Sequence, residues 1–377
     1  MLTNDGQDGQ IDGFKVLNVN MVDFAIPTNY TFVDHLGSSN YGNVIKVRRT
    51  DGQEFAIKKM YEPFRNPMEA RRVYRELKLL RLLNHDNVIR FVGAYTPDTD
   101  INNLKNVFIV TEYAGVSLKY VLDRQKCNDI RLINDDHIKY IIYQLLRALK
   151  YLHSADVIHR DLKPSNLALT EECDLTVVDF CLARTLSNND VGLTAYVISR
   201  WYRSPEVIYW NHVSYNFKAD VWSVGCILSE LFTGKVVFKG SEAIEQYRLI
   251  VNLCGSPDAE LMDKIETQNN SSMRMVVEAL GGGCVRQDFR KYFAGLPEDA
   301  IDLLDKILVL DPDRRISVEE ALQHPYMAQY SMPSDEPLAP APFVIDDGDY
   351  KKDVNYWKEC VWSEIEETRS PALANAL

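Results

Sequence analysis

Residues 159–169 read HRDLKPSNLAL and directly follow a long apolar segment. Within eight positions this stretch places five polar or charged side chains: His159, Arg160, Asp161, Lys163 and Asn166. A loop that only connects two structural elements does not need so many charges beside a buried helix, so the density indicates function. Thirteen residues after Asn166 comes Asp179, where the β-branched run TVV ends and a loop begins.

The types of these side chains indicate one kind of chemistry. A carboxylate such as Asp161 can orient a hydroxyl group, and a lysine such as Lys163 can balance phosphate charge. An amide and a second carboxylate, here Asn166 and Asp179, can hold a metal ion. Together the residues form a set suited to phosphoryl transfer.

Two upstream features are compatible with phosphate binding. LGSSNYGNVIKV carries Gly37 and Gly42 between two predicted strands, where glycine lets backbone amides approach phosphate oxygens. Alone, these glycines are equally typical of a plain hairpin turn. Lys58 follows on an apolar strand as a candidate phosphate anchor, although a surface lysine is the alternative. Glu76 lies within the next predicted helix and can pair with Lys58.

Bulk composition limits the function classes. The chain has 377 residues, which favours two lobes. Its 42 Lys and Arg against 54 Asp and Glu give a net charge of −12, which argues against a nucleic-acid partner and favours basic partners. Seven cysteines without CxxC spacing predict a reduced intracellular protein without structural zinc. No segment has the apolar length of a signal peptide or membrane span, and we expect no membrane partner.

Periodicity predicts an α+β fold with two lobes. Residues 30–111 hold short alternating runs typical of strands, interrupted by one helical pattern at 67–83. The second lobe is mainly helical, with long apolar helices predicted at 138–155, 219–234 and 297–310.

The two ends of the chain differ in character. Residues 1–25 are polar and predicted to be loosely ordered. From Ser331 the tail is rich in proline and acidic residues, which predicts an extended strap over the surface. It ends in the amphipathic segment VNYWKECVWSEIEE, whose Tyr356, Trp357 and Trp362 are expected to dock on the body.

The order and spacing of these motifs resemble those of a eukaryotic protein kinase from about Tyr30 to Met327. The resemblance is closest to mitogen-activated protein kinases of the stress-activated branch. That narrower likeness rests on LKPSN in the loop above and on YRELKLL (74–80), LTAYVISRWYRSPEV (193–207), VLDPDRRI (309–316) and SDEP (334–337). It implies a bilobal kinase fold with an N-terminal extension at 1–29, an N-lobe at 30–111, a C-lobe at 112–327 with its activation segment at 179–206, and a C-terminal tail at 328–377 packing back on the lobes.

The resemblance also implies residue roles. Lys58, Glu76, Asp161 and Lys163 would form the catalytic set, with Asn166 and Asp179 as ligands of Mg²⁺. ATP would be bound by Leu36, Gly37, Ser38, Ser39, Asn40, Tyr41, Gly42, Asn43, Val44, Lys58, Thr111, Glu112 and Ala114. Two structural contacts would support the site: Asp220 beneath the catalytic loop, and a pair between Glu206 and Arg315.

The activation segment spans 28 residues without clear periodicity, and loops of that length are usually functional or disordered. It contains Thr194-Ala195-Tyr196 at the place where the family is phosphorylated twice, with alanine where this branch usually has glycine. Thr194 and Tyr196 can also be read as ordinary loop residues. Arginines at the matching phosphate-binding positions favour the first interpretation: Arg72, Arg75, Arg160 and Arg184 for Thr194, and Arg200 and Arg203 for Tyr196.

Some positions depart from the family pattern. Ser39 replaces the second loop glycine, and Cys181 replaces the glycine after the metal-binding aspartate. If Cys181 must adopt a left-handed backbone, the strain is about 1–2 kcal/mol, and a thiol beside cations would be easily modified. Met332 and Ser334 stand where relatives carry acidic docking residues, which leaves Asp335 and Glu336 to bind basic peptides.

The function implied is that of an ATP-dependent serine/threonine kinase in stress signalling. It would act on Ser/Thr-Pro sites after dual phosphorylation, with a dual-specificity upstream kinase, phosphatases and substrates bearing basic docking peptides as partners. We expect a monomer in cytoplasm and nucleus. The alternative is a catalytically weak pseudokinase or scaffold, given Cys181 and Ser39. A metabolic nucleotide-binding enzyme is disfavoured, because no G-x-G-x-x-G follows a strand in a βαβ unit.

Overall fold

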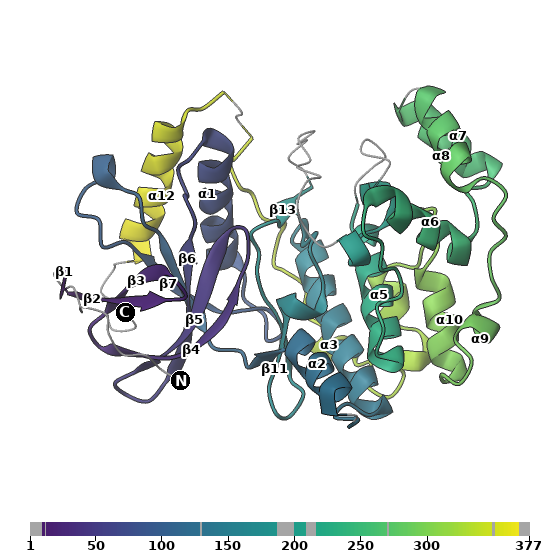
Figure 1. The fold of residues 1–377 in the computed structure, drawn as a ribbon, viewed down its shortest axis with the longest axis horizontal. Coiled ribbons are helices and arrows are strands. Elements are labelled where there is room, and N and C mark those ends of the chain that lie inside the picture. The colour runs from purple at the N-terminus through teal and green to yellow at the C-terminus, as the bar shows by residue number, and fades with distance from the viewer. Residues whose placement is uncertain are drawn as a thin grey trace.

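The computed structural model describes residues 10–11, 13–128, 130–186, 200–208, 216–269, 271–348 and 351–368. It shows two lobes side by side, one built around a β-sheet and one mainly of helices (Figure 1). Within the described ranges, no helix combines the length and the apolar character that crossing a membrane requires. The α+β bilobal prediction is confirmed.

The first lobe is built on an antiparallel five-stranded sheet in the order β4-β5-β6-β8-β7. The strands are β4 (Tyr30–Ser38), β5 (Gly42–Arg49), β6 (Glu54–Met60), β7 (Phe91–Tyr95) and β8 (Phe108–Glu112). One long helix, α1 (Pro67–Leu82), and the short η1 (Ile101–Asn103) accompany the sheet. The start of α1 is fixed by Asn66, whose side chain accepts a hydrogen bond from the backbone N–H of Glu69, and by a proline in the first turn.

An additional hairpin covers this sheet near the N-terminus. β2 (Phe14–Val19) pairs with β3 (Val22–Pro27), and β1 (Gln10–Ile11) joins β2. Phe24 is fully buried and packs on Phe108, with ring centroids 6.2 Å apart. The prediction that residues 1–25 are loosely ordered is therefore wrong for 14–25, because β3 pairs with β2 and its consecutive apolar residues Phe24, Ala25 and Ile26 are buried.

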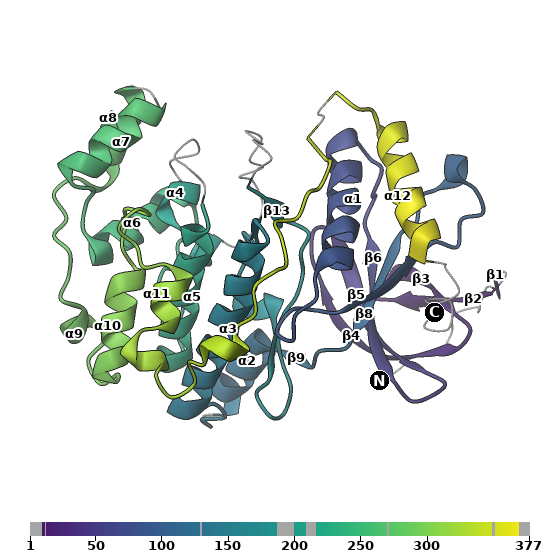
Figure 2. The same cartoon turned by 180° about the vertical axis from the view of Figure 1, so that it is seen from behind.

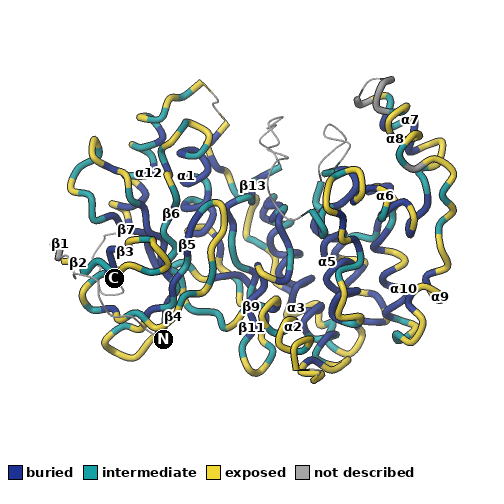
Figure 3. The backbone as a smooth tube through the Cα atoms, viewed as in Figure 1, coloured by how far each residue is buried: buried dark blue, intermediate teal, exposed yellow. Residues whose placement is uncertain are grey.

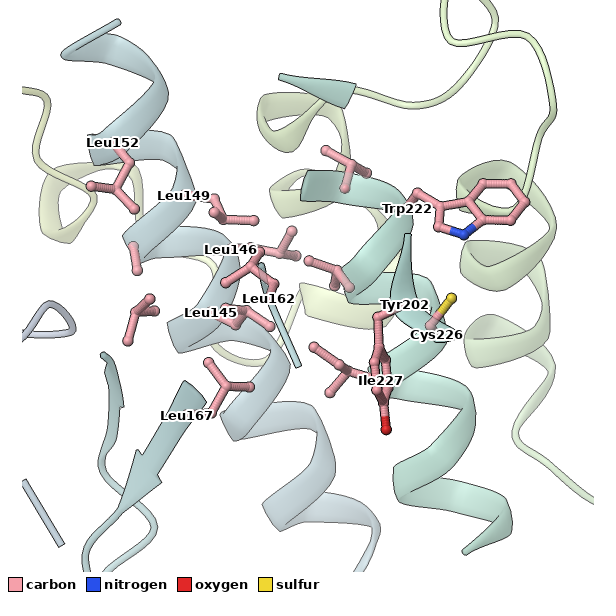
Figure 4. Packing of buried hydrophobic residues seen from close by; sticks show 14 of the residues in the cluster. Leu145, Leu146, Leu149, Leu152, Leu162, Leu167, Tyr202, Trp222, Cys226 and Ile227 are labelled. Carbon is pink, nitrogen blue, oxygen red and sulfur yellow. The ribbon is translucent and has the colours of Figure 1, made fainter. Parts of the chain in front are cut away.

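The second lobe is centred on two apolar helices that lie side by side and run antiparallel (Figure 4), α3 (Asp135–Ser154) and α5 (Lys218–Thr233). Leu146 and Leu149 of α3 and Ile227 of α5 fill the space between them (Figure 4), and both helices are buried along most of their length (Figure 3). α3 begins with a capping box between Asn134 and His137. The other helices of this lobe are α2 (Leu118–Asn128), α4 (Pro205–Ile208), α6 (Ala243–Cys254), α7 (Ala259–Asn269), α8 (Ser271–Gly281), α9 (Phe289–Tyr292), α10 (Glu298–Ile307) and α11 (Val318–Leu322).

Short strands and turns at the lobe boundary carry the loops of the site. β11 (Leu167–Leu169) pairs with β12 (Leu175–Val177) and with β9 (Val116–Ser117), while β10 (Val157–Ile158) pairs with β13 (Arg184–Thr185). The 3₁₀ turns are η2 (Pro164–Asn166), η3 (Arg200–Tyr202), η4 (Pro325–Met327) and η5 (Pro333–Asp335). These pairings hold the segment around Asp161 and the segment around Asp179 next to each other.

The tail returns from the helical lobe to the β-rich lobe (Figure 2). On the way, the backbone N–H of Phe343 donates to the carbonyl oxygen of Ala155 at 2.8 Å. The tail ends in α12 (Val354–Thr368), which lies against α1. Trp357 is 1% exposed and its ring lies 5.5 Å from that of Tyr74. The predicted docking of this segment is confirmed.

Candidate active site

Lys58 lies on the inner strand β6, and two carboxylates bind its ammonium group. Its Nζ donates to Glu76 Oε1 at 2.7 Å and to Asp179 Oδ1 at 2.8 Å. Glu76 comes from α1, whereas Asp179 follows β12 in the other lobe. Burial lowers the pKa of Lys58, but the charges of Asp179 and Glu76 outweigh it and hold this pKa well above its usual value. The lysine is therefore a permanent cation that connects the two lobes.

Asp179 is held in a left-handed backbone conformation, with φ of 63°. Burial would raise the pKa of Asp179, but Lys58 lowers it to about 2, so the carboxylate is ionised. The next residue, Phe180, is buried and its ring lies 5.0 Å from the ring of His159. This packing fixes the segment after β12 against the catalytic loop.

The carboxylate of Asp161 is oriented by its own loop. Its Oδ2 accepts hydrogen bonds from Lys163 Nζ at 2.6 Å and from Asn166 Nδ2 at 3.0 Å. Asn166 Nδ2 also donates to the backbone oxygen of Asp161 at 2.8 Å. Because Oδ2 accepts both of these hydrogen bonds, Oδ1 is the carboxylate oxygen suited to accept a hydrogen bond from a substrate hydroxyl.

Asp220, in the first turn of α5, supports this loop from below. Its carboxylate accepts the backbone N–H groups of His159 and Arg160, both at 2.9 Å. His153 Nε2 lies 3.1 Å from the same carboxylate. Asp220 is 1% exposed and its pKa is lowered, since His153 and these hydrogen bonds outweigh the effect of burial. The predicted supporting role agrees with this geometry.

The predicted pair of Glu206 and Arg315 is formed and fully buried. Arg315 donates to the two oxygens of Glu206 at 2.7 and 3.0 Å. Such a two-pronged contact is the strong form of an ion pair. It holds the end of the activation segment against the helical lobe and lies away from the catalytic loop.

Asn166 and Asp179 have the donor chemistry that a Mg²⁺ ion requires. The amide nitrogen of Asn166 is taken by Asp161, so its carbonyl oxygen is the atom suited to a cation. The Asp179 carboxylate uses Oδ1 for Lys58 and keeps Oδ2. Magnesium prefers such hard oxygen ligands and takes only one or two from the protein in phosphoryl-transfer sites.

The predicted nucleotide loop joins β4 to β5. Leu36, Gly37 and Ser38 end β4; Ser39, Asn40 and Tyr41 form the turn; Gly42, Asn43 and Val44 begin β5. Ser39 Oγ accepts the N–H of Tyr41 at 3.2 Å and donates to the carbonyl of Gly42 at 3.4 Å, so serine closes the turn where the family has glycine. Gly42 cannot be replaced easily, because an added Cβ would lie 2.5 Å from the carbonyl oxygen of Lys59.

The predicted adenine contacts lie where β8 ends. The N–H groups of Glu112 and Tyr113 donate to the carbonyls of Arg90 and Glu54. Among the described residues, no backbone carbonyl takes the N–H of Ala114, which fits a donor for an adenine ring. Thr111, one strand position before Glu112, is half-buried. Gly115 has φ of 103° and an added Cβ would lie 2.0 Å from the oxygen of Leu169, so only glycine lets the lobes approach here.

The structure corrects both expectations about Cys181. Its φ is not positive; the left-handed residue of this segment is Asp179. The expected strain of about 1–2 kcal/mol at Cys181 is therefore absent. The thiol is 3% exposed, and burial together with the charge of Asp179 raises its pKa well above the usual value. A buried, protonated thiol is a poor nucleophile, so the expectation of easy modification is also wrong.

Thr194 and Tyr196 lie outside the described residues, but the six arginines predicted to read their phosphates are within them. Arg160 and Arg184 are brought together, since Ile158 pairs with Arg184 in the β10–β13 ladder. Arg200 begins η3 and Arg203 follows it, and the backbone N–H of Arg203 donates to the carbonyl oxygen of Arg200.

The two arginines of α1 have other partners. Arg72 donates to Glu69 at 2.6 Å, and its guanidinium carbon lies 4.4 Å from the ring centroid of Tyr41. Arg75 Nε donates to Asp347 in the tail. Sequence motifs did not reveal Asp347 or the Tyr41 contact. The tail is rich in acidic residues and Asp346 directly precedes Asp347, so the sequence singles out neither Asp347 nor its partner.

The two residues predicted to bind docking peptides differ in exposure. The side chain of Asp335 is 58% exposed and lies 3.1 Å from Arg147. Glu336 is buried and accepts from Lys150 at 2.8 Å. Of these two carboxylates, only that of Asp335 is exposed to solvent.

Comparison with known proteins agrees with this geometry. The model of the protein kinase domain matches residues 30–327. Mitogen-activated protein kinase pmk-3 of Caenorhabditis elegans is 49% identical over 362 residues, which cover 93% of this chain and 76% of the relative. Mitogen-activated protein kinases pmk-1 of the same nematode and p38b of Drosophila melanogaster are each 41% identical, covering 94% and 93% of this chain and 90% and 93% of the relatives. The chain therefore belongs to the protein kinases and, within them, to the mitogen-activated protein kinases of the stress-activated branch.

Proposed function

We propose that this kinase transfers the γ-phosphoryl group of ATP to serine or threonine hydroxyls that are followed by proline. The observation that carries the proposal is the complete constellation around Lys58. Its Nζ is bound at 2.7 Å by Glu76 and at 2.8 Å by Asp179, and the oriented carboxylate of Asp161 lies in the adjacent loop. Every charged group that the chemistry needs is present.

In this proposal each residue has one task. Asp161 Oδ1 accepts the proton of the substrate hydroxyl while Lys163 holds Oδ2 and reduces charge on the transferred group. Lys58 contacts the phosphates and is positioned by Glu76. Magnesium held by Asn166 and Asp179 would neutralise phosphate charge.

ATP would bind between the nucleotide loop and the end of β8. The backbone of residues 36–44 would cover the phosphates, and Glu112 and Ala114 would offer backbone groups to adenine behind Thr111. Ser39 is compatible with this assignment, since its hydroxyl makes its hydrogen bonds within the turn, to Tyr41 and Gly42. The closed turn also weighs against the pseudokinase alternative.

Activation would follow phosphorylation of Thr194 and Tyr196 by a dual-specificity upstream kinase, and phosphatases would reverse it. Each phosphate adds about −1.5 to −2 charges and is suited to arginine clusters. Arg184 pairs with Ile158, two residues before Arg160, and these two arginines would bind the phosphate on Thr194 together with Arg72 and Arg75 of α1. Arg200 and Arg203 would serve Tyr196.

Partners would be protein substrates with basic docking peptides, which the net charge of −12 favours. Asp335 would provide the exposed contact, with Glu336 adding charge from beneath. We propose that the kinase acts as a monomer in cytoplasm and nucleus, with the domain borders given by the sequence.

The test is a peptide-array assay with the purified protein before and after phosphorylation by a dual-specificity kinase. We expect transfer to Ser-Pro and Thr-Pro peptides and little transfer to matched Ser-Ala peptides. The variant carrying both Thr194→Ala and Tyr196→Phe should stay at the basal rate. Nucleotide binding without any transfer by the phosphorylated protein would instead establish the scaffold alternative.

A further inference from the structure

A cavity of about 610 Å³ lies in the β-rich lobe, away from the residues of the candidate active site. Its walls come from four parts of the chain: the start of β3, the end of β6 with the segment that follows it, the loop between β7 and β8, and α12. Sites that hold small organic molecules usually measure about 300–1,000 Å³. The cavity is therefore large enough for a ligand of that kind.

The direction of Lys59 separates this cavity from the ATP site. Lys59 directly follows Lys58 on β6, and successive side chains of a strand point to opposite faces of the sheet. Lys58 Nζ binds Glu76 and Asp179, whereas Lys59 Nζ donates to the backbone oxygen of Asp23 in β3. A ligand beside Lys59 would thus lie on the face of the sheet that is turned away from the catalytic lysine.

The lining of the cavity carries an excess of positive charge. Its charged side chains are four cations and two carboxylates: Lys59, Arg65, Lys105, Lys358, Asp23 and Glu62. The excess is local, because the whole chain has a net charge of −12. An anion would therefore be attracted to this part of the surface more than to the rest of the molecule.

Both carboxylates of the lining already have partners. Asp23 Oδ1 accepts a hydrogen bond from Asn18 Nδ2 at 2.6 Å. The carboxylate of Glu62 lies 3.6 Å from Arg65, and both of these side chains are largely exposed. These two pairs leave the lysines as the charges available to a ligand.

The three lysines have no such partners. In the part of the chain that the structure describes, none of Lys59, Lys105 and Lys358 forms an ion pair with a carboxylate. Burial lowers the pKa of Lys59, and nearby aspartates offset this effect only partly. Lys358 Nζ lies 5.4 Å from the ring centroid of Phe64. An ammonium group that is partly removed from water interacts more strongly with an anion than one in bulk solvent.

We propose that this cavity binds a small molecule that carries two or more phosphate groups. Its lysines come from β6, from the β7–β8 loop and from α12, so each can contact a different phosphate group. Lysine acts on phosphate as a point charge and needs no fixed fork geometry. Val22, Phe64 and Leu104 line the same cavity and provide apolar contact for a carbon skeleton. One inorganic phosphate would leave most of the 610 Å³ unfilled.

The test measures binding of inositol hexakisphosphate to the full chain by calorimetry, with a chelator to remove Mg²⁺ and with an uncharged adenine-site inhibitor filling the ATP site. The variants are Lys59→Gln, Lys105→Gln, Lys358→Gln and the triple variant. Lys291→Gln in α9 is the matched control, because Lys291 is 87% exposed and belongs to the other lobe. A second arm uses phosphatidylcholine vesicles containing phosphatidylinositol 4,5-bisphosphate, which separates a lipid headgroup from a free ligand.

We expect saturable binding of one inositol hexakisphosphate per chain, with a Kd that rises with ionic strength. Each single lysine substitution should raise the Kd about three- to tenfold, since each removes one charge-assisted contact. The triple variant should raise it at least about thirtyfold, and Lys291→Gln should change it less than twofold. Lys105 is exposed, so Lys105→Gln carries the test if Lys59→Gln does not fold.

Three outcomes would overturn the proposal. A parent chain without saturable binding in either arm would show that the cavity does not take phosphates. A triple variant that binds as tightly as the parent would place the probe elsewhere, for instance at Arg160 and Arg184. Equal weakening by Lys291→Gln would show attraction by overall charge alone. Lysine-dependent binding to the vesicles but not to the free probe would support the site and identify a lipid headgroup as its ligand. None of these measurements depends on phosphoryl transfer, so their failure leaves the proposed function unaffected.

Discussion

The catalytic loop and α1 both present charged groups to the same site, yet they are held in different ways. Asp161 is oriented by Lys163 and Asn166, which lie two and five residues away in the chain. α1 is held by tail residues that lie 272 and 286 positions from their partners. One part of the site is built locally, and the other depends on the end of the chain.

This difference separates the loop that performs the chemical step from the helix whose position depends on distant contacts. The loop has its geometry fixed by short-range contacts and by the buried Asp220, so its substitutions should affect the chemical step. α1 is positioned by ion pairs with the tail, and in the proposed activation a phosphate on Thr194 would compete with the tail for Arg75. Changes on each side should therefore produce different kinetic results.

The largest effect should come from a substitution in the catalytic loop, which is the locally built part of the site. Asp161→Asn removes the proton acceptor but keeps the shape of the side chain. We expect turnover to fall by about 10²–10⁴-fold, the usual worth of a general base. The affinity for ATP, measured by calorimetry, should change less than threefold because no phosphate contact is lost. Unchanged turnover would remove Asp161 from the mechanism.

Loss of the contact between the tail and α1 should lower the free energy of unfolding. Trp357→Ala empties a fully buried site between α12 and α1, and such truncations cost about 3–5 kcal/mol. Urea unfolding measures the loss. Trp362→Ala, at a half-buried position of the same helix, is the matched control and should cost clearly less. Equal costs would mean that Trp357 is not the main anchor of the tail.

A smaller, pH-dependent effect should come from the junction of the lobes, where His85 lies 4.9 Å from the ring of Tyr151. Burial and the charge of Arg147 lower the pKa of His85 to about 4. The unfolded chain then binds the proton first, so stability falls as the pH drops from about 6.5 to 4.

We expect this loss to be about 1–2 kcal/mol, because one pKa unit corresponds to about 1.4 kcal/mol and the partly exposed ring is screened by solvent. His85→Asn retains an acceptor for the N–H of Asn87 and removes the titration. Its unfolding free energy should therefore depend less on pH over this range. Parallel pH profiles of the parent and the variant would contradict the assignment.

The smallest effect should be that of Cys181→Gly. Since Cys181 carries no left-handed strain, glycine brings no relief, and the phosphorylated enzyme should keep its rate within about twofold. Stability should fall by about 0.5–1 kcal/mol from the added backbone freedom. A rate increase of tenfold or more would show that the cysteine restrains the active arrangement.

The same difference between local and distant contacts explains which features the sequence could predict. The sheet, the long apolar helices and the constellation of Lys58, Glu76, Asp161 and Asn166 follow from local patterns and from motif order. The hairpin at 14–27 is not apparent from the sequence, because Lys15, Asn18 and Asp23 interrupt its apolar residues without a regular alternation. Buried pairing with β2 and the sheet gives it order.

Other errors had similar physical causes. The backbone of Cys181 was inferred from the residue type usual at that place, but the tertiary structure puts the left-handed conformation at Asp179. The Asp347–Arg75 pair joins residues 272 positions apart. No spacing or periodicity relates such positions, so only the folded chain reveals the contact.

The most direct test of the central claim is a double-mutant cycle that combines Glu76→Gln with Asp347→Asn in the unphosphorylated protein. The measurement is kcat/KM for ATP with radiolabelled nucleotide on the parent, both single variants and the double variant. If the tail holds α1 with Glu76 at Lys58, Asp347→Asn should lower kcat/KM several-fold when Glu76 is present and less than twofold once Glu76 is replaced. Two losses that multiply independently would contradict the claim that the tail positions the catalytic glutamate.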